Sequence, residues 1–402
     1  MSEIWKRTRA AFNLPEGVTY LDGNSLGPLP KAALARVEET MRAEWGEMLI
    51  GGWNKGGPQG NGWMGEPTRL GDRIGALIGA GPGTTVIGDT LSIKVYQALA
   101  AGLPLAGERR IILSDNGNFP TDLYMAQGLI DTLGQGHELL CVEPEDVAGR
   151  IRNDIAVLLL THVDYRTGRM HDMADLTRRA HEAGVIVVWD LAHSAGAVEV
   201  DLAACQADFA VGCTYKYLNA GPGAPAFITM RADHAATVQP ALAGWLGHDA
   251  PFAFEPNYRA GPGIERFRVG TPSVLQMAAL DAALDIWDAV DMGSVRARSI
   301  ELSQAFIERV DTSTDLTLAS PRDPLQRGSQ VSFQHPEGYA VMQALIARGI
   351  IGDFRAPDIL RFGFAPLYNT MADVARATDA LADILTTGAW DRPEFRARKA
   401  VT

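Results

Sequence analysis

Apolar residues in the middle of the chain come in short unbroken runs, separated by stretches with helical spacing. The two patterns alternate between about residues 68 and 235. Apolar runs without polar alternation are typical of strands that helices cover on both faces. We expect strands at 110–114, 138–142, 155–161, 185–190, 209–214 and 226–230, and helices at 68–78, 92–101, 121–133 and 173–183. The pattern predicts an α/β fold with a mostly parallel sheet flanked by helices.

The N-terminal part follows a different pattern. Residues 1–50 predict an arm with a short amphipathic start, a loop of turn-forming residues at 22–28 and a helix over about 30–46. The segment 51–62 is unusually rich in glycine and contains Trp53. It predicts a covering loop.

The C-terminal part predicts one long helix and then a smaller α+β unit. The helix is expected over 273–290 and to continue past Gly293 to about residue 310. The unit that follows has expected strands at 330–334, 350–354 and 360–363, and helices at 338–348 and 371–386. We therefore expect three parts: the arm (1–50), a large cofactor domain (51–272) and a connecting helix with a small domain (273–402).

Composition and charge exclude several classes of function. The chain has 402 residues, of which 47% are hydrophobic and 21% charged, as is typical of a soluble enzyme. Its net charge of −12 argues against nucleic-acid binding. No apolar run is long enough to span a membrane, and no histidine or cysteine spacing suggests a metal site. The charged N-terminus and three cysteines without a CxxC motif predict a cytoplasmic protein.

An aspartate and a lysine lie at the ends of two apolar runs. Asp190 ends the run 185–190, and Lys216 follows the run 209–214 between two tyrosines. Open α/β sheets place their chemistry at strand ends, and pyridoxal 5'-phosphate (PLP) needs an amine for covalent attachment and an anion beside its ring nitrogen. Each residue also has a structural interpretation, as a helix cap and as a surface lysine. Together with the glycine-rich segment 220–224, the pair favours a PLP site.

Three further segments offer polar groups that a cofactor or substrate would need. The segment 88–92 opens a predicted helix and suits a phosphate, although it is also a good N-cap. Phe119 and Asp122 suit a flat cofactor, or simply begin a helix. Arg361 lies inside an apolar run, so its guanidinium must pair with a substrate carboxylate or with an Asp or Glu of the protein. No GxGxxG, P-loop or GxSxG motif supports another chemistry.

Seven strings spread over nearly the whole chain resemble those of the kynureninase family. They are YLDGNSLGPLPK at 20–31, GDTLS at 88–92, NFPTDLYMAQG at 118–128, DLAHSAG at 190–196, TYKYLNAGPGAPAFI at 214–228, PALAGWLGH at 240–248 and LRFGFAPLYNT at 360–370. The resemblance implies a fold-type I PLP enzyme of tryptophan catabolism with a smaller C-terminal α+β domain. It implies hydrolysis of the Cβ–Cγ bond of L-kynurenine, and less well of 3-hydroxy-L-kynurenine, to anthranilate or 3-hydroxyanthranilate and L-alanine.

The resemblance also assigns roles to single residues. Lys216 matches the lysine that holds PLP, Asp190 the partner of the ring nitrogen, and Arg361 the arginine that binds the substrate carboxylate. The other positions expected to contact PLP are Leu91, Ser92, Phe119, Asp122, Thr161, His193, Tyr215, Trp245 and Thr271, and those expected at the substrate are Asn24, Ser25 and Trp53. Trp245 and Thr271 would come from the partner subunit, which implies a homodimer with the site at the subunit interface.

Departures from the family pattern and the expected chemistry refine this prediction. Thr271 stands where animal enzymes carry asparagine, and Trp53 where they carry histidine, which favours kynurenine over its hydroxylated form. Ser92 replaces a common threonine and keeps the hydroxyl.

Lys216 is expected to remove the Cα proton. Tyr215 is a candidate acid near the carbonyl, although packing and phosphate binding would also explain it.

Three rival functions remain. Another fold-type I enzyme, such as a cysteine desulfurase or a small-molecule aminotransferase, would share the fold and cofactor. A desulfurase needs a mobile cysteine, and none of Cys141, Cys205 and Cys213 lies in a predicted polar loop. A non-catalytic, cofactor-bound scaffold would need neither a covalent lysine nor a carboxylate-binding arginine.

Overall fold

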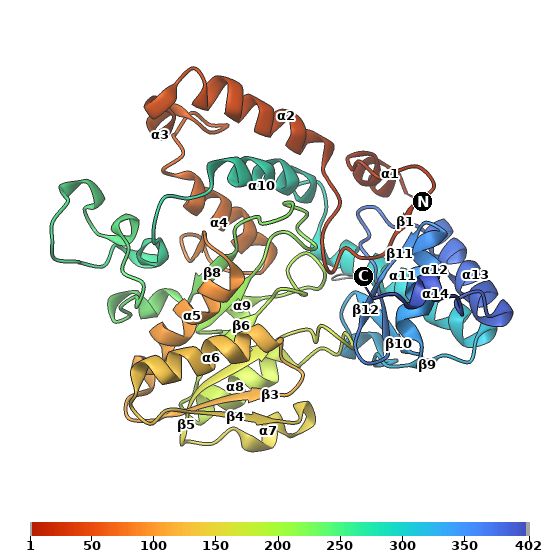
Figure 1. The fold of residues 1–402 in the computed structure, drawn as a ribbon. Helices are drawn as coiled ribbons and strands as arrows, with labels where there is room; N and C mark the ends of the chain where they lie inside the picture. The colour runs from red at the N-terminus through yellow and green to blue at the C-terminus, as the bar shows by residue number, and fades with distance from the viewer. Residues whose placement is uncertain (1, 399–402) are drawn as a thin grey trace.

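The computed structural model describes residues 2–398 and contains a seven-stranded sheet (Figure 1). The strand order is β2-β8-β7-β6-β5-β3-β4. The bounds are β2 Thr85–Ile87, β3 Ile111–Asp115, β4 Glu138–Val142, β5 Ile155–Thr161, β6 Ile186–Asp190, β7 Phe209–Gly212 and β8 Phe227–Met230. The pairs from β7 to β4 are parallel, and β8 runs antiparallel to both of its neighbours. The predicted mostly parallel α/β sheet is confirmed.

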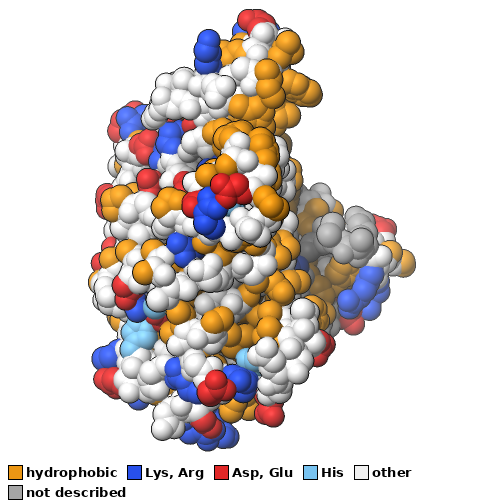
Figure 2. Space-filling view, turned by 90° about the vertical axis from the view of Figure 1, so that its left-hand side faces the viewer, with side chains coloured by type: hydrophobic (Ala, Val, Ile, Leu, Met, Phe, Trp, Pro, Cys, Tyr) orange, Lys and Arg blue, Asp and Glu red, His pale blue; other side chains and the backbone are white. Residues whose placement is uncertain are grey.

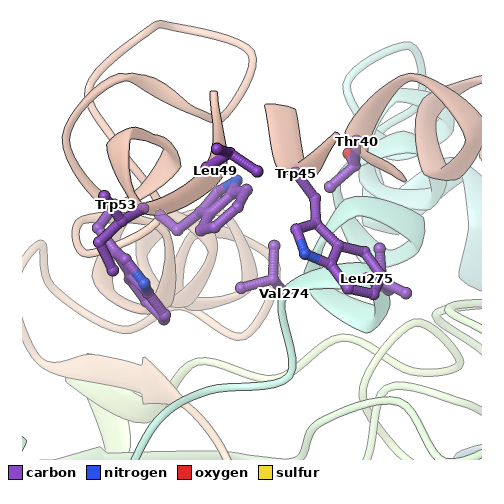
Figure 3. A pocket seen from close by; sticks show the side chains of 8 residues that line it. Thr40, Trp45, Leu49, Trp53, Val274 and Leu275 are labelled. Carbon is purple, nitrogen blue, oxygen red and sulfur yellow. The ribbon is translucent and has the colours of Figure 1, made fainter. Parts of the chain in front are cut away.

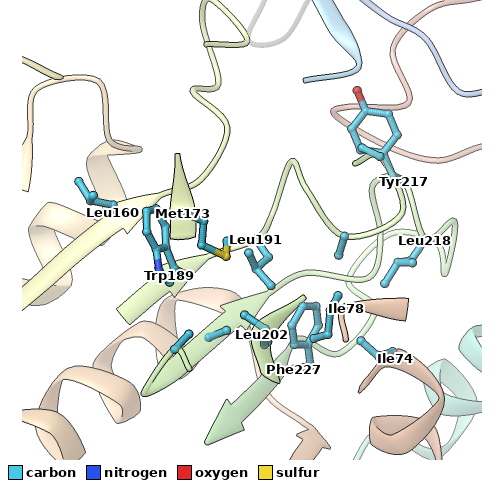
Figure 4. Packing of buried hydrophobic residues seen from close by; sticks show 14 of the residues in the cluster. Ile74, Ile78, Leu160, Met173, Trp189, Leu191, Leu202, Tyr217, Leu218 and Phe227 are labelled. Carbon is cyan, nitrogen blue, oxygen red and sulfur yellow. The ribbon is translucent and has the colours of Figure 1, made fainter. Parts of the chain in front are cut away.

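Both faces of the sheet are apolar because successive side chains of each strand enter opposite cores. In β5, Leu158 and Leu160 pack on one side while Val157 and Leu159 pack on the other. On the first side Leu160 and Trp189 lie close together (Figure 4). This face is covered by α4 (Glu66–Leu77), α8 (Met173–Glu182), α9 (Leu202–Cys205) and α10 (Val274–Trp287), and the opposite face by α5 (Leu91–Gly102) and α6 (Pro120–Leu133).

The C-terminal part has its own four-stranded sheet in the order β12-β13-β10-β9. The strands are β9 Thr317–Leu318, β10 Gln330–Gln334, β12 Asp353–Arg355 and β13 Ile359–Gly363. They pack with α11 (Met292–Ser313), α12 (Gly338–Ala347) and α13 (Met371–Thr387) around a second core that contains Phe306, Phe333 and Phe362. The exact division of the chain at residues 50 and 272 stays a prediction.

The N-terminal arm joins the two parts. After α1 (Glu3–Ala10), β1 (Thr19–Tyr20) pairs in parallel with β11 (Ile350–Ile351) of the C-terminal part. The chain then turns and enters α2 (Lys31–Glu39), which lies along α10 (Figure 1). The loop between β1 and α2 therefore passes over the region where the large sheet meets the C-terminal sheet.

Two elements that were predicted to be continuous are each divided in two, so the prediction of their continuity was wrong. The long helix expected from 273 to 310 is two helices, because Asp291 leaves the helical conformation and its side chain caps α11 by accepting from the Ser294 N–H at 2.8 Å. The strand expected at 350–354 splits at Gly352 into β11 and β12, which belong to different sheets. A Cβ at Gly352 would lie 2.8 Å from the Arg361 carbonyl oxygen, so glycine is required where the chain changes sheet.

Other differences are smaller. The helix expected over 30–46 is α2 followed by a π-helical turn, η1 (Thr40–Trp45). The strands β1, β2 and β9, the helix α9 and several other short helices were not anticipated, and the other predicted helices and strands begin and end within a few residues of their expected bounds. Within residues 2–398, no helix is both long and apolar enough to cross a membrane.

Gly71 allows α4 to approach the edge strand β2, since a Cβ there would lie 2.2 Å from the Thr85 carbonyl oxygen. We predict that Gly71→Ala lowers the free energy of unfolding by about 1–3 kcal/mol, because backbone atoms must separate. Gly128→Ala is the matched control: Gly128 is exposed in α6 with open space around its Cα, so alanine should stabilise by about 0.5–1 kcal/mol. Urea denaturation measures both, and equal shifts of the midpoint would contradict the packing argument.

Candidate active site

The carboxyl ends of β5 and β6 meet near the middle of the large sheet. β5 ends at Thr161 and β6 at Asp190, and the strand register pairs these two residues. The Asp190 carboxylate is buried and accepts hydrogen bonds from the Ala192 N–H at 2.8 Å and the Thr161 hydroxyl at 3.3 Å. Asp190 therefore ends a strand as predicted, and its side chain holds a turn rather than a helix.

A second buried carboxyl lies beside Asp190. Asp122, in the first turn of α6, is 1% exposed, and its Oδ2 atom has no hydrogen-bond partner. Burial raises the pKa of both carboxyls, and the nearby Asp190 raises the pKa of Asp122 further. A cationic ring N–H beside them would supply both a missing donor and a balancing charge. The two residues therefore fit the protonated pyridine ring of PLP.

Two lysines are buried within residues 2–398, and their amines have different surroundings. The Lys94 amine donates to three acceptors at 2.9–3.2 Å, so it is a fully bonded structural cation. The Lys216 amine, just beyond β7, lies 3.2 Å from Nε2 of His193. Lys216 is therefore the buried lysine whose amine is available for covalent attachment.

His193 lies between the lysine and the N-terminal arm. Its Nε2 atom is also 3.1 Å from the Asn24 carbonyl oxygen, and its buried Nδ1 atom has no partner. Burial, followed by the charges of Lys216 and Arg361, lowers the pKa of His193 well below its usual value. The imidazole is therefore neutral and offers an unused polar atom, as a residue beside a cofactor would.

The predicted phosphate-binding segment opens a helix as expected. α5 begins at Leu91, and Thr90 occupies the N-cap position, but its side chain makes no capping hydrogen bond. The first-turn N–H groups of α5, with the Ser92 hydroxyl beside them, are thus left for an anion. Asp89 has a positive φ of 54°, which shapes the turn that leads into this helix.

Phe119 and Thr161 are joined through a residue that the sequence did not single out. The Asn118 side-chain oxygen accepts from the Phe119 N–H at 2.7 Å and from the Thr161 hydroxyl. Phe119 precedes α6, and its ring, 39% exposed, meets the Tyr165 ring edge-on at 5.2 Å. Phe119 thus keeps a face free for stacking. Asn118 begins the string NFPTD, and its position directly before Phe119 was the signal that could have identified it.

Tyr215 lies beside the lysine. Its ring centre is 5.8 Å from the Lys216 amine, and its carbonyl oxygen accepts from the Gly27 N–H of the arm at 2.8 Å. Burial raises the pKa of Tyr215, so the phenol keeps its proton. A protonated phenol can donate, which is what a general acid must do.

Arg361 forms the structural ion pair that was one of the two expectations for it. It is 1% exposed, and its guanidinium makes a bidentate contact with Asp353, with Nε 2.8 Å from Oδ1. The antiparallel register of β12 and β13 places the two residues opposite each other. Nη2 also donates to the Ser25 hydroxyl at 2.7 Å, and Nη1 donates to the Tyr165 carbonyl. Asp353 was missed because its pairing depends on strand register.

Asn24 completes the surroundings of the guanidinium. In the orientation that satisfies its amide, the side-chain oxygen accepts from Arg361 Nε at 2.8 Å. Lys216, His193, Asn24 and Arg361 therefore form one continuous chain of contacts. The structure brings the predicted lysine and arginine to one site, and it places Asn24 and Ser25 of the arm between or beside them.

Trp53, Trp245 and Thr271 lie in other surroundings. The Trp53 ring meets the Trp63 ring at 5.3 Å and lines an apolar pocket with Leu49 and Val274, between the arm and the start of α10 (Figure 3). Trp245 is 42% exposed and packs on Phe252, and Thr271 is exposed. Their expected roles toward PLP and substrate stay predictions. Within residues 2–398, no group of three or more His, Cys, Asp and Glu side chains is placed to hold a metal ion.

The overall fold is similar to those of solved PLP enzymes. A cysteine desulfurase from Thermococcus onnurineus NA1 matches with a TM-score of 0.79 over 96% of this chain and 99% of that one, at 20% identity. A C-DES mutant with glycine covalently linked to the PLP cofactor matches with a TM-score of 0.80 over 93% of this chain and 99% of that one, also at 20% identity. At this identity the likeness concerns the fold alone.

Sequence similarity is more specific. The family model described as the kynureninase C-terminal domain matches residues 295–381. A kynureninase from Burkholderia pseudomallei (strain 1106a) is 50% identical, with 98% of this chain and 95% of that protein covered. A kynureninase from Pseudomonas fluorescens is 48% identical with the same coverage. Because such identity extends over almost all of both sequences, the chain belongs to the kynureninase family.

Proposed function

We propose that the protein uses PLP to hydrolyse the Cβ–Cγ bond of L-kynurenine, which releases anthranilate and L-alanine in tryptophan catabolism. Membership of the family makes it a PLP-dependent hydrolase of carbon–carbon bonds. The structural observation that carries the proposal is the chain of contacts from Lys216 through His193 and Asn24 to Arg361. These contacts support a site in which Lys216 holds the cofactor and Arg361 binds an α-carboxylate.

The residues give each step a physical basis. PLP, when bound, draws electrons away from the Cα atom of an attached amino acid. Asp190, beside the buried Asp122, would pair with the ring nitrogen, and the α5 N-terminus would bind the phosphate. Lys216 would hold the cofactor and then remove the Cα proton of the substrate.

Two further residues act on the substrate in this proposal. Arg361 would bind the α-carboxylate through donors that Ser25 and Asn24 now occupy, which fixes the direction of the Cα–H bond. Tyr215 would donate a proton near the γ-carbonyl, where charge develops as water adds and the carbon–carbon bond breaks. Its protonated phenol suits that role.

A cysteine desulfurase or an aminotransferase is the alternative function. The desulfurase resemblance concerns the fold, and burial raises the pKa of Cys141, Cys205 and Cys213, so all three are held as thiols. A desulfurase needs a reactive thiolate. In the deciding assay the purified protein is mixed with PLP and L-kynurenine, and anthranilate is followed by its fluorescence. Transfer of the kynurenine amino group to an added 2-keto acid, without anthranilate, would support an aminotransferase instead.

The same assay addresses substrate preference. We propose that L-kynurenine is turned over with a higher kcat/KM than 3-hydroxy-L-kynurenine, because Trp53 and Thr271 stand at the positions expected near the aromatic end of the substrate. Trp53 lies in an apolar, tryptophan-lined pocket that offers few partners to an added hydroxyl.

We predict that Lys216→Ala abolishes the visible absorbance of the cofactor–lysine imine and all anthranilate release, because no other buried lysine amine within residues 2–398 is free. Borohydride reduction of the wild type followed by peptide mass analysis should place the label on Lys216. Lys6→Ala, which removes an exposed lysine of α1, is the control and should keep both signals. A label on Lys94 would refute the assignment.

For Tyr215→Phe we expect kcat to fall by about 100-fold while PLP retention changes little, since a general acid contributes about 10²–10⁴-fold. Tyr124→Phe changes the same group on an exposed face of α6 and should have no effect. Unchanged kcat with weaker PLP retention would show instead that the phenol binds the cofactor and does not act as a general acid.

We further propose that the protein is a cytoplasmic homodimer with its sites at the subunit interface. Its three cysteines are free, as is usual in a reducing compartment. Large apolar side chains are exposed on the arm, such as Ile50 at 80%, and on the segment after Trp245, where Phe254 is 77% exposed. Figure 2 shows hydrophobic side chains gathered on one face of the molecule. Such patches are typical of protein interfaces.

Co-expression of two inactive variants tests whether Trp245 serves the partner's site. A dimer of one Lys216→Ala chain and one Trp245→Ala chain would rebuild one complete site, so about a quarter of wild-type activity should return in a random mixture. Co-expressed Lys216→Ala and Asp190→Asn chains are the control and should stay inactive, because both residues belong to the same subunit's site. No recovery in the first mixture would place Trp245 outside the partner's site.

A further inference from the structure

Asp22 is a half-buried acid of the arm that the reaction scheme leaves without a role. Its carbonyl oxygen accepts from the N–H groups of Ser25 and Leu26 at 3.0 Å, so it forms the turn that carries Ser25 to Arg361. Its carboxyl faces the side chains of Ser25 and Asp353. The Oδ1 atom is buried and has no partner.

Asp22 belongs to a cluster of two acids and two cations, together with Asp353, Arg355 and Arg361. Asp353 accepts from Arg361 Nε at 2.8 Å, from Arg355 Nη2 at 2.9 Å and from the Ser25 hydroxyl at 2.6 Å. The other titratable groups that face Asp22 are the phenol of the half-buried Tyr20 and those of the buried Tyr217 and Tyr368. Burial raises the pKa of all three phenols, so they remain neutral.

The net charge of this cluster depends on the protonation of Asp22 and changes when a substrate carboxylate binds. With Asp22 ionised, two carboxylates balance the two guanidiniums, and a substrate carboxylate would leave one excess negative charge in a buried place. With Asp22 protonated, the cluster carries one positive charge, and the substrate carboxylate neutralises it. A buried uncompensated charge is costly, so the second arrangement is favoured.

The proton on Asp22 also explains its contacts. Two ionised carboxylates that face each other repel, whereas one shared proton allows a hydrogen bond between them. The unpartnered Oδ1 atom is much less costly as the carbonyl of a neutral acid than as part of a carboxylate. Both observations point to a neutral Asp22 beside an ionised Asp353.

We propose that Asp22 is a positioning residue whose protonation is coupled to the binding of the substrate carboxylate at Arg361. The inference rests on the proposed function, because it assigns Arg361 to the substrate. It goes beyond that function in naming a proton that the protein takes up or retains when an amino acid binds. The arm thereby sets the pH range in which the carboxylate site accepts its ligand.

The direction of the pH dependence follows from the protonation of Asp22. Burial, and then the charge of Asp353, raises the pKa of Asp22 to about 7. Below this pH the acid is protonated and the site is cationic, so the substrate binds well. Above it the acid ionises and the site loses its net positive charge. KM for L-kynurenine should therefore rise with pH, by at most about tenfold per pH unit for full coupling.

The test compares KM in the wild type and in Asp22→Asn, measured as PLP-loaded enzyme from pH 6 to 9 by anthranilate release. The amide has the shape of the protonated acid and cannot ionise. The substrate amine and the cofactor titrate alike in both proteins, so the ratio of the two KM values isolates Asp22. We expect the wild-type KM to approach that of Asp22→Asn at pH 6 and to exceed it several-fold at pH 8.5.

Two variants keep the result interpretable. Asp22→Leu is also uncharged and should give the same flat profile relative to the wild type, although it cannot hydrogen-bond. Asp315→Asn makes the same chemical change at an exposed position and should follow the wild type. A constant KM ratio across the pH range in active enzyme would overturn the inference. Absence of anthranilate from every protein at every pH would instead overturn the proposed function.

Discussion

The site depends on the cost of burying charged groups in a protein interior. At the ends of β5 and β6, Asp190 and Asp122 are removed from water by the same apolar strands that make the sheet stable. Neither is joined to an arginine or lysine by an ion pair within residues 2–398. Such a place stabilises a cation that brings its own donor, and a protonated aromatic nitrogen meets both needs. A protonated PLP ring nitrogen beside these two buried carboxyls would therefore stabilise them.

The same constraint explains how three distant parts of the chain meet at Arg361. Its guanidinium is held by Ser25 of the arm, Tyr165 of the loop after β5, and Asp353 of the C-terminal sheet. A buried guanidinium has five N–H groups to satisfy, and no single segment supplies enough acceptors. Because all three segments contact one side chain, a ligand that takes over some of its donors must act on all of them. If Arg361 binds the substrate as proposed, substrate binding and the position of the arm are physically connected.

The sequence predicts the bounds of several strands correctly. The bounds of β4, β5 and β10 match the expectation at both ends, and β5 is a continuous apolar run that is buried along its whole length. Breaks within continuous patterns were missed. Asp291 interrupts an otherwise helical stretch, and Gly352 divides a strand between two sheets. The first break depends on a local helix cap, and the second depends on a close contact with β13. The spacing of hydrophobic residues carries no information about either.

A similar limit separates the parts of the site that the residues alone indicate from those that they do not. Asp190 and Lys216 could be recognised because strand ends and flanking glycines are visible in the sequence. Asp353 and Asp22 could not, because the pairing of Asp353 with Arg361 depends on strand register, and Asp22 meets Asp353 only when the arm folds against the C-terminal part. The fold is shared with cysteine desulfurases at only 20% identity. At that identity the fold alone is shared, and the contacts around Arg361 come from this chain's own arm and C-terminal sheet.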